Sequence, residues 1–329
     1  MLQIQTSDPL NILGSTRRVL EQADNVKINI EAVEKLAADV KIFLGDNSHK
    51  YKSHKTGDNF DHDIARAFWQ SVMGFCYWAE KGKEKWQVEW PKGNILAGGW
   101  YGVIACYDRA LAEDIQVLNA SWLMDIPEED LRKIFRSATE SEIPLFNERT
   151  EIMRNTAKIL VEKFAGDPIF MLEKSEYDAV KLLQLLKEFP NFHDVPTYMN
   201  EKVVFLKLAH LVAGEFDRVL KSHGKGGLKN MDQICVFADY KLPQLLRAYG
   251  VLEYSQELAD KVDDYELIPK ESNEEIEIRA GTIWGVELIR QILNSHTSIE
   301  LGQAIWLMSQ SEELQKRIKP YHRTYTIFY

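Results

Sequence analysis

Apolar side chains recur every three or four residues along most of this chain, the spacing that places them on one face of an α-helix. The pattern predicts helices over residues 33–44, 152–164 and 182–189, with Gly45 ending the first. The pair Asp167-Pro168 is typical of a helix start, because proline needs no N–H partner in a first turn. The sequence therefore predicts a mostly α-helical fold.

Two segments depart from the helical spacing. Between residues 86 and 98, two tryptophans and a valine alternate with polar residues ahead of the turn Pro91-Lys92-Gly93-Asn94, which predicts one small β-hairpin. Ile276 and Ile278 alternate with charged residues, which predicts a further short strand. Fold class is therefore expected to be mostly α with little β-structure.

The organisation of the chain is expected to be simple. At 329 residues with 45% hydrophobic content, the chain can bury a large core, and we expect a single globular domain over 1–329. A proline-containing link near residue 190 leaves two lobes, 1–190 and 191–329, as the alternative. The polar stretches 45–61 and 261–275 are typical of surface loops.

Charge and cysteine content exclude several classes of protein. A formal net charge of −10 argues against non-specific nucleic-acid binding, which requires a basic surface, so a stable nucleic-acid partner is not expected. The 3 cysteines, Cys76, Cys106 and Cys235, lie far apart among apolar residues and are typical of buried thiols in a reducing compartment. Without a targeting segment, a membrane-length apolar run or a metal-ligand motif, the sequence predicts a cytoplasmic protein with no membrane association, no metal and no cofactor.

One carboxylate has an informative position. In Phe237-Ala238-Asp239-Tyr240-Lys241-Leu242-Pro243-Gln244, Asp239 follows an apolar run and precedes a helix that Pro243 suits and Gly250 can end. The positive end of the helix dipole would favour an ionised Asp239. The position alone fits both a helix cap and a working acid.

The octet around Asp239 resembles the hallmark of the queuosine salvage family, the queuosine 5'-phosphate N-glycosylases. Further segments resemble that family in the same order, over roughly residues 10 to 329. They are Phe75-Cys76-Tyr77-Trp78, Gly98-Gly99-Trp100, Asp108-Arg109-Ala110-Leu111, Ile143-Pro144-Leu145, Glu148-Arg149, Phe205-Leu206-Lys207, Glu277-Ile278-Arg279, Trp284-Gly285-Val286-Glu287-Leu288-Ile289-Arg290, His322-Arg323-Thr324 and Ile327-Phe328-Tyr329.

The resemblance implies a compact helical glycosylase-like fold and a hydrolase that acts on N-glycosyl bonds. Its substrate would be queuosine 5'-phosphate or a related modified nucleoside monophosphate. The products would be ribose 5-phosphate and a free base such as queuine, which is salvaged toward tRNA modification. The expected partner is thus a small molecule. Two alternatives stay open, namely a DNA or RNA base glycosylase and a non-catalytic protein that binds modified nucleotides.

The resemblance also implies roles for two charged residues. Breaking the bond between ribose and base builds positive charge on the sugar, which a nearby carboxylate stabilises or attacks, and Asp239 fits that role. Lys207 would be a catalytic cation near the sugar or its phosphate. A surface lysine is the alternative for Lys207.

Aromatic and acidic residues are expected to contact the base. Trp284 and Glu287 are one helical turn apart, so the indole could stack on the base while the carboxylate accepts from its N–H edge. A core tryptophan and a Glu287–Arg290 pair are the alternatives. Tyr240, Trp100 and Phe75 are further candidates for substrate binding.

The segment 320–329 is unusually aromatic and is expected to dock onto the protein. His322 and Arg323 would then offer hydrogen-bond donors to a 5'-phosphate, and Tyr329 would contact the substrate. A tail that only fills the core is the alternative.

Four positions depart from the family pattern. Ser71 and Gly74 stand where the family has an Asp and an Asn that contact the base, Leu208 replaces a basic residue, and Glu215 replaces an Asp. These departures predict that the accepted base differs from queuine or is less strictly selected.

Overall fold

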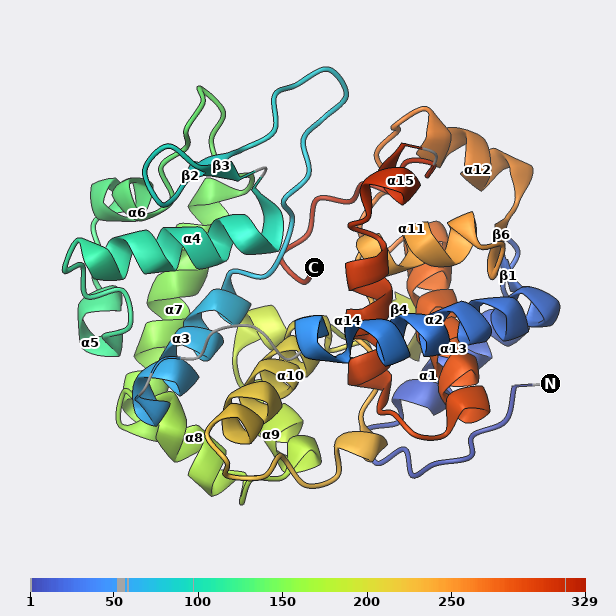
Figure 1. Ribbon diagram of the computed structural model, residues 1–329, viewed down its shortest axis with the longest axis horizontal. Helices are drawn as coiled ribbons and strands as arrows, with labels where there is room; N and C mark the ends of the chain where they lie inside the picture. Colours follow the sequence, from blue (N-terminus) through green and yellow to red (C-terminus); the bar gives the residue numbers. More distant parts are fainter. Residues whose placement is uncertain (1, 52–56, 58, 97, 317) are drawn as a thin grey trace.

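Helices dominate the computed structural model, which describes residues 2–51, 57, 59–96, 98–316 and 318–329 (Figure 1). The mostly α fold class is thereby confirmed. The α-helices are α1 (Ile12–Glu21), α2 (Ile30–Tyr51), α3 (Phe60–Val72), α4 (Gly99–Ala112), α5 (Ala120–Leu123), α6 (Glu128–Ile134), α7 (Phe146–Phe164), α8 (Pro168–Lys174), α9 (Ala179–Leu186), α10 (Lys207–Ser222), α11 (Lys241–Ala248), α12 (Gln256–Asp263), α13 (Asn273–Leu293), α14 (Ser298–Met308) and α15 (Glu312–Gln315). Short 3₁₀ helices are η1 (Pro190–Phe192) and η2 (Met231–Gln233).

The β-structure consists of short antiparallel pairs. The predicted hairpin is confirmed, because β2 (Val88–Glu89) pairs with β3 (Ile95–Leu96) and Val88 lies opposite Leu96. The expectation of a single hairpin was wrong. In the described residues β1 (Val26–Ile28) also pairs with β6 (Leu252–Tyr254), and β4 (Thr197–Tyr198) pairs with β5 (Glu201–Lys202).

The strand predicted at Ile276 and Ile278 is also wrong, because both residues lie in α13. Ser272 caps this helix by accepting a hydrogen bond from the Glu275 N–H. Glu277, the charged residue between the two isoleucines, is buried as well and accepts hydrogen bonds from Asn25. A helix buried all around shows no single apolar stripe, and this produced the misleading alternation.

Helix ends were predicted with mixed success. Phe164 ends α7, and Asp167 caps α8 by accepting a hydrogen bond of 2.9 Å from the Ile169 N–H, as predicted. Gly45, in contrast, does not end α2, which continues to Tyr51. The loop predicted over 45–61 is therefore helical over 45–51 and again over 60–61, where α3 begins, and its residues 52–56 and 58 lie outside the described residues.

The second predicted loop, 261–275, is shorter than expected. Helix α12 extends to Asp263 and α13 begins at Asn273, so the irregular connection covers residues 264–272. The three cysteines are free and buried, as predicted.

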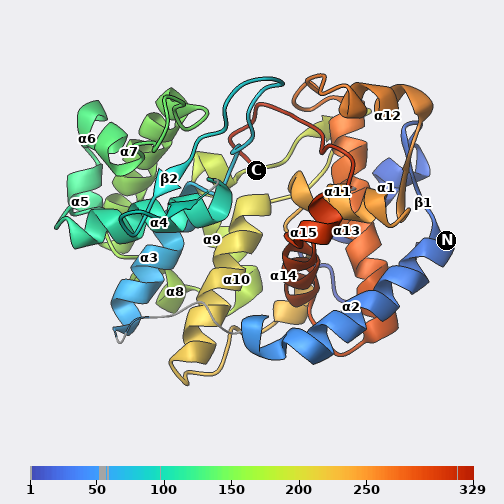
Figure 2. The ribbon, with the colours of Figure 1, turned by 45° about the horizontal axis from the view of Figure 1, so that its top comes forward.

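Helices from the two halves of the sequence pack against each other. Helix α3 packs on α10, and α13 packs on α1, α2 and α14. The C-terminal segment runs between the part of the molecule that holds α4 and the part that holds α14 and α11, and both views show its end there (Figures 1 and 2). Among the described residues, no helix has the length and apolar character needed to cross a bilayer. The single-domain organisation stays a prediction.

Candidate functional site

A cavity of about 680 Å³ opens where the segment after α3 meets α10, α11, α14 and the C-terminal segment. This volume suits a ligand of nucleotide size. The lining includes Gly74, Tyr77, Lys85, Leu96, Gly98, Gly99, Trp100, Tyr101, Lys207, Leu211, Glu215, Arg218, Phe237, Asp239, Tyr240, Lys241, Gln303, Trp306, Leu307, Gln310, Gln315, Tyr321 and Tyr329. Five predicted site residues are thereby brought together: Asp239, Lys207, Tyr240, Trp100 and Tyr329.

Asp239 lies just before α11 and is 9% exposed. Its Oδ1 atom accepts hydrogen bonds from the backbone N–H groups of Lys241 at 2.8 Å and Leu242 at 3.0 Å. These bonds fix the orientation of the carboxyl group at the N-terminal end of the helix, where the helix dipole interacts favourably with a carboxylate. The side chain therefore caps α11 and lines the cavity at once, so the two interpretations of its position are compatible.

Lys207 is the first residue of α10 and is 5% exposed. Its Nζ donates a hydrogen bond of 2.7 Å to the Gly74 carbonyl oxygen. Burial lowers the pKa of Lys207 to about 8, against the opposing attraction of Asp239. The surface-lysine alternative is thus wrong, and the ammonium is a buried cation whose charge interacts with that of Asp239.

Aromatic rings border the cavity near α11. The rings of Tyr240 and Tyr321 lie 4.8 Å apart between centroids, and Lys241 Nζ is 5.4 Å from the Tyr321 centroid. Burial raises the pKa of Tyr240 well above its ordinary value, so its phenol stays protonated. Burial lowers the pKa of Lys241 to about 8.

Another wall combines the start of α4 with α14. Gly98 and Gly99 both have positive φ, which allows the sharp turn that presents Trp100 and Tyr101. The Tyr101 ring lies 5.5 Å from the Trp306 ring between centroids. This wall is largely apolar and aromatic, as is usual for the binding site of a flat heterocycle.

The C-terminal segment contributes differently from the prediction. It docks as expected, and Tyr329 lines the cavity. His322 is buried and does not line the cavity. Its Nε2 atom forms a hydrogen bond of 3.4 Å with the Tyr329 hydroxyl. Arg323 bonds the backbone oxygens of Ala79 and Tyr321 and is also absent from the lining.

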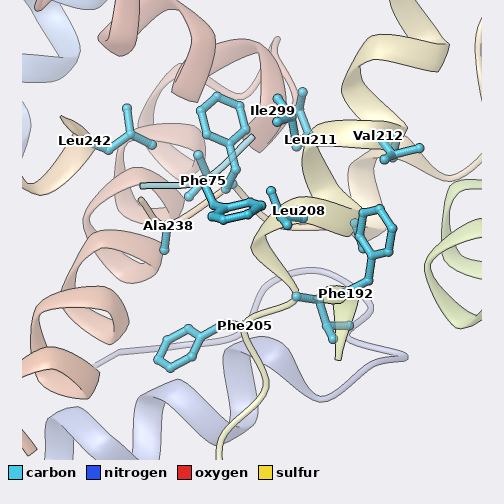
Figure 3. Close-up of a cluster of buried hydrophobic side chains, with 14 of the residues drawn as sticks. Phe75, Phe192, Phe205, Leu208, Leu211, Val212, Ala238, Leu242 and Ile299 are labelled. Atoms are coloured by element: carbon cyan, nitrogen blue, oxygen red, sulfur yellow. The ribbon is translucent and has the colours of Figure 1, made fainter. Parts of the chain in front are cut away.

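Three other predicted contacts are not at the cavity. Trp284 is 0% exposed and is a core tryptophan, and Glu287 forms a buried ion pair with Arg290. Neither residue lines the cavity, so for both the alternative given from the sequence is the one observed. Phe75 is buried, with the Arg149 guanidinium 4.0 Å from its ring centroid, and it lies beside Leu208 and Ala238 in the core (Figure 3).

The departures from the family pattern also have structural explanations. Ser71 is buried and bonds the Ala67 carbonyl oxygen, away from the cavity lining. Leu208 packs in the apolar cluster of Figure 3. Gly74 reaches the cavity and offers no side chain there, while Glu215 lines it and binds Arg218 at 2.7 Å. Position 71 therefore does not face a ligand in this cavity.

Sequence reasoning missed several residues of the lining. Tyr77 and Lys241 line the cavity and lie inside segments that resemble the family, so their place in those segments could have identified them as site residues. Lys85 and Trp306 had no such signal. Among the described residues, no group of His, Cys, Asp or Glu side chains could hold a metal ion.

Comparison with known proteins places this chain in a family. The model of the queuosine salvage protein family matches residues 53–329. The chain belongs to the queuosine salvage protein family. It is 36% identical over 328 residues to a protein of Sphaerobacter thermophilus named queuosine 5'-phosphate N-glycosylase/hydrolase, covering 98% of each chain. Proteins of the same name are 32% identical in Mus musculus, covering 98% of this chain and 99% of that one, and 34% identical in Bos taurus, covering 80% of each.

The family match agrees with the resemblance carried by the octet at 237–244. In this member of the queuosine salvage family, four residues of the octet line the cavity. They are Phe237 at the end of the apolar run, Asp239, Tyr240, and Lys241 at the start of α11. The region matched by the family model also includes α10, which supplies Lys207.

Proposed function

We propose that this chain hydrolyses the N-glycosidic bond of queuosine 5'-phosphate, releasing queuine for salvage toward tRNA modification and leaving ribose 5-phosphate. One water is consumed, whose hydroxyl goes to the anomeric carbon while its proton ends on the base. The relatives are named for this activity. The observation that carries the proposal is the placement of Asp239 and Lys207 at one cavity of nucleotide size.

In the proposed reaction, Asp239 faces the anomeric carbon. Its Oδ1 is occupied by two backbone N–H groups, and Oδ2 has no protein hydrogen-bond partner among the described residues. That oxygen stabilises the positive charge that develops on the ribose as the base departs, or forms a transient bond to it. The surrounding protein strengthens this interaction, because little water competes for the carboxylate.

Lys207 acts as the cation of the site. One of its three N–H donors is used by Gly74, so two remain for a ribose or phosphate oxygen. Its charge is attracted by the carboxylate of Asp239, which opposes the lowering of the Lys207 pKa by burial. Because the pKa of Lys207 is about 8, the ammonium is the main form at neutral pH.

The base and phosphate would occupy different parts of the cavity. The rings of Trp100 and Tyr240 offer faces on which a flat base can stack. Lys241 and Lys85 are lining cations in place of the His322 and Arg323 expected from sequence, and we assign the 5'-phosphate to them. Lys241 follows Asp239 closely in the chain, which keeps the phosphate near the reacting sugar.

The proposal carries expectations about partners and compartment. The substrate is a small nucleotide, no stable nucleic-acid partner is expected, and the reaction takes place in the cytoplasm. The net charge of −10 supports a small substrate over a nucleic acid, whose phosphates would be repelled.

A turnover assay tests the proposal. The full chain is incubated separately with queuosine 5'-phosphate, queuosine, guanosine 5'-phosphate and 7-deazaguanosine 5'-phosphate, and base release is measured by chromatography. We expect base release from queuosine 5'-phosphate to be far more efficient than from the other three compounds, with Asp239→Asn as the inactive control. Absence of release from queuosine 5'-phosphate would contradict the proposal.

The same panel separates the alternatives. Tight binding of queuosine 5'-phosphate without base release would identify a non-catalytic binding protein. Salt-dependent binding and base release from an oligonucleotide would identify a nucleic-acid glycosylase. Release from another modified nucleotide in preference to queuosine 5'-phosphate would show that the base specificity has changed.

A further inference from the structure

A buried arginine lies behind the cavity and has no place in the reaction described above. Arg279, on α13, is 1% exposed and does not line the cavity. Its Nε donates a hydrogen bond of 3.2 Å to the carbonyl oxygen of Ala238. Ala238 immediately precedes Asp239, so Arg279 holds the backbone from which the carboxylate projects.

The same guanidinium is linked to the other charged residue of the site. Arg279 binds both carboxylate oxygens of Asp194, and its Nη1 also donates to Glu275 at 3.2 Å. Asp194 Oδ2 in turn accepts a hydrogen bond of 3.3 Å from the Lys207 backbone N–H. The Asp194 backbone oxygen also accepts from the N–H groups of Phe205 and Leu206, so Asp194 determines where α10 begins.

Aromatic rings hold the guanidinium in place. Its central carbon is 4.0 Å from the Phe205 ring centroid and 4.4 Å from that of Tyr329. Phe205 precedes Lys207 by two residues, and Tyr329 lines the cavity. Arg279 therefore contacts three segments that are distant in sequence and that each contribute to the cavity wall.

We infer that Arg279 is a positioning residue that sets the separation of Asp239 and Lys207, acting on Asp239 through the Ala238 carbonyl and on Lys207 through Asp194. The inference rests on the proposed function for its effect on turnover. Arginine suits this task because its planar group offers five donors in a rigid arrangement, whereas lysine has a single compact charge. Small displacements of catalytic groups cost about 10²-fold in rate, so the network matters for turnover.

Two variants and a matched control test the turnover effect. Arg279→Lys keeps the buried positive charge but cannot reach Ala238 and both Asp194 oxygens together. We expect kcat to fall by about 10²-fold while KM stays within a few fold. Arg290→Lys is the control, because Arg290 is buried on the same helix, pairs with Glu287 and lies away from the cavity lining. Equal losses of kcat in the two variants at equal melting temperature would overturn the inference.

A second measurement does not depend on activity. The groups that act on the Lys207 ammonium are Asp239 and Asp194, which raise its pKa, and Arg279, which lowers it. In a protein carrying isotope-labelled lysine, NMR titration follows this pKa, with the Lys207 signal assigned by its loss in Lys207→Arg. Asp194→Asn should lower the pKa and Arg279→Met should raise it, each by about one unit, while Arg290→Met should leave it unchanged.

The outcomes separate the two proposals. If the unaltered protein releases no base, the proposed function fails and the titration alone decides the role of Arg279. Opposite shifts from Asp194→Asn and Arg279→Met support the network. No shift in either variant overturns it. If Arg279→Met does not fold, the Lys207 pKa in Asp194→Asn and the kcat of Arg279→Lys test the inference instead.

Discussion

Lys207 Nζ donates its hydrogen bond of 2.7 Å to the carbonyl oxygen of Gly74, across the boundary between α10 and the segment that follows α3. Helices α3 and α10 pack directly on each other, and this packing brings Lys207 and Gly74 together. One donor of the ammonium is thereby tied to the protein, and the other two can serve a ligand.

Gly74→Ala should disturb this arrangement. An added Cβ would lie 2.8 Å from Leu211 Cδ2 and 2.9 Å from the Ser71 backbone oxygen, so the backbone must shift and carry the Gly74 carbonyl with it. We expect a loss of about 1–3 kcal/mol in the free energy of unfolding together with lower activity. Thermal melting and turnover measure the two effects.

Gly45→Ala is the matched control for that substitution. Gly45 lies within α2, and an added Cβ has no heavy atom within 4 Å among the described residues. Alanine favours the helix over glycine by about 0.5–1 kcal/mol, so the melting temperature should rise slightly while activity stays the same. A stable and fully active Gly74→Ala protein would show that the close packing around Gly74 yields without moving its carbonyl.

Asp239→Asn should separate catalysis from helix capping. Asparagine also caps helices well, so stability should change by less than about 1 kcal/mol, whereas loss of the charge should lower kcat by about 10²-fold or more. Asp167→Asn is the control, because Asp167 caps α8 by a similar bond and lies away from the cavity lining. Normal turnover in the Asp239→Asn protein would leave this carboxylate a capping role only.

Lys241→Met should weaken recognition of the 5'-phosphate. We expect KM for the nucleotide to rise by about tenfold or more, with little change for the nucleoside, since only the former carries the charge that Lys241 binds. The pKa of Lys241 is about 8, so the ammonium loses its charge and KM of the unaltered protein should rise as pH increases through this value. Lys83→Met, at an exposed lysine outside the lining, is the control. Equal effects on nucleotide and nucleoside would remove this assignment.

His322 should make the protein less stable in acid. Burial and the charges of Arg279 and Arg323 lower its pKa to about 3, from an ordinary value of 6.5. Between these values the unfolded chain binds a proton that the folded protein does not, so the free energy of unfolding falls as pH decreases below 6.5. His322 alone contributes a slope of up to about 1.4 kcal/mol per pH unit.

His322→Gln should reduce that slope, because glutamine does not titrate. Urea unfolding at several pH values between about 7 and 4 measures the slope in both proteins. His210 has a pKa lowered to about 4 by burial, so part of the pH dependence should remain. An identical slope in both proteins would mean that His322 is accessible to protons in the folded state.

Local interactions were readable from the sequence alone. The period of the apolar residues predicted the helical class, and Asp167-Pro168 marked the start of α8, because capping and first-turn preferences act over a few residues. The octet likewise placed Asp239 before a helix, and its capping bonds span only two and three residues. The same local logic failed in α13, where burial on all sides removed the apolar stripe.

Only the tertiary structure decided which side chains share the cavity. Trp284 and Trp306 look alike in sequence, yet the first is enclosed by the core and the second lines the cavity. Lys207 became a buried cation because α10 packs on α3 and brings its ammonium to Gly74, 133 positions away in the chain. Sequence spacing specifies which residues share a helix face, but the direction of that face depends on how distant helices pack, and so do burial, pKa and the membership of the site.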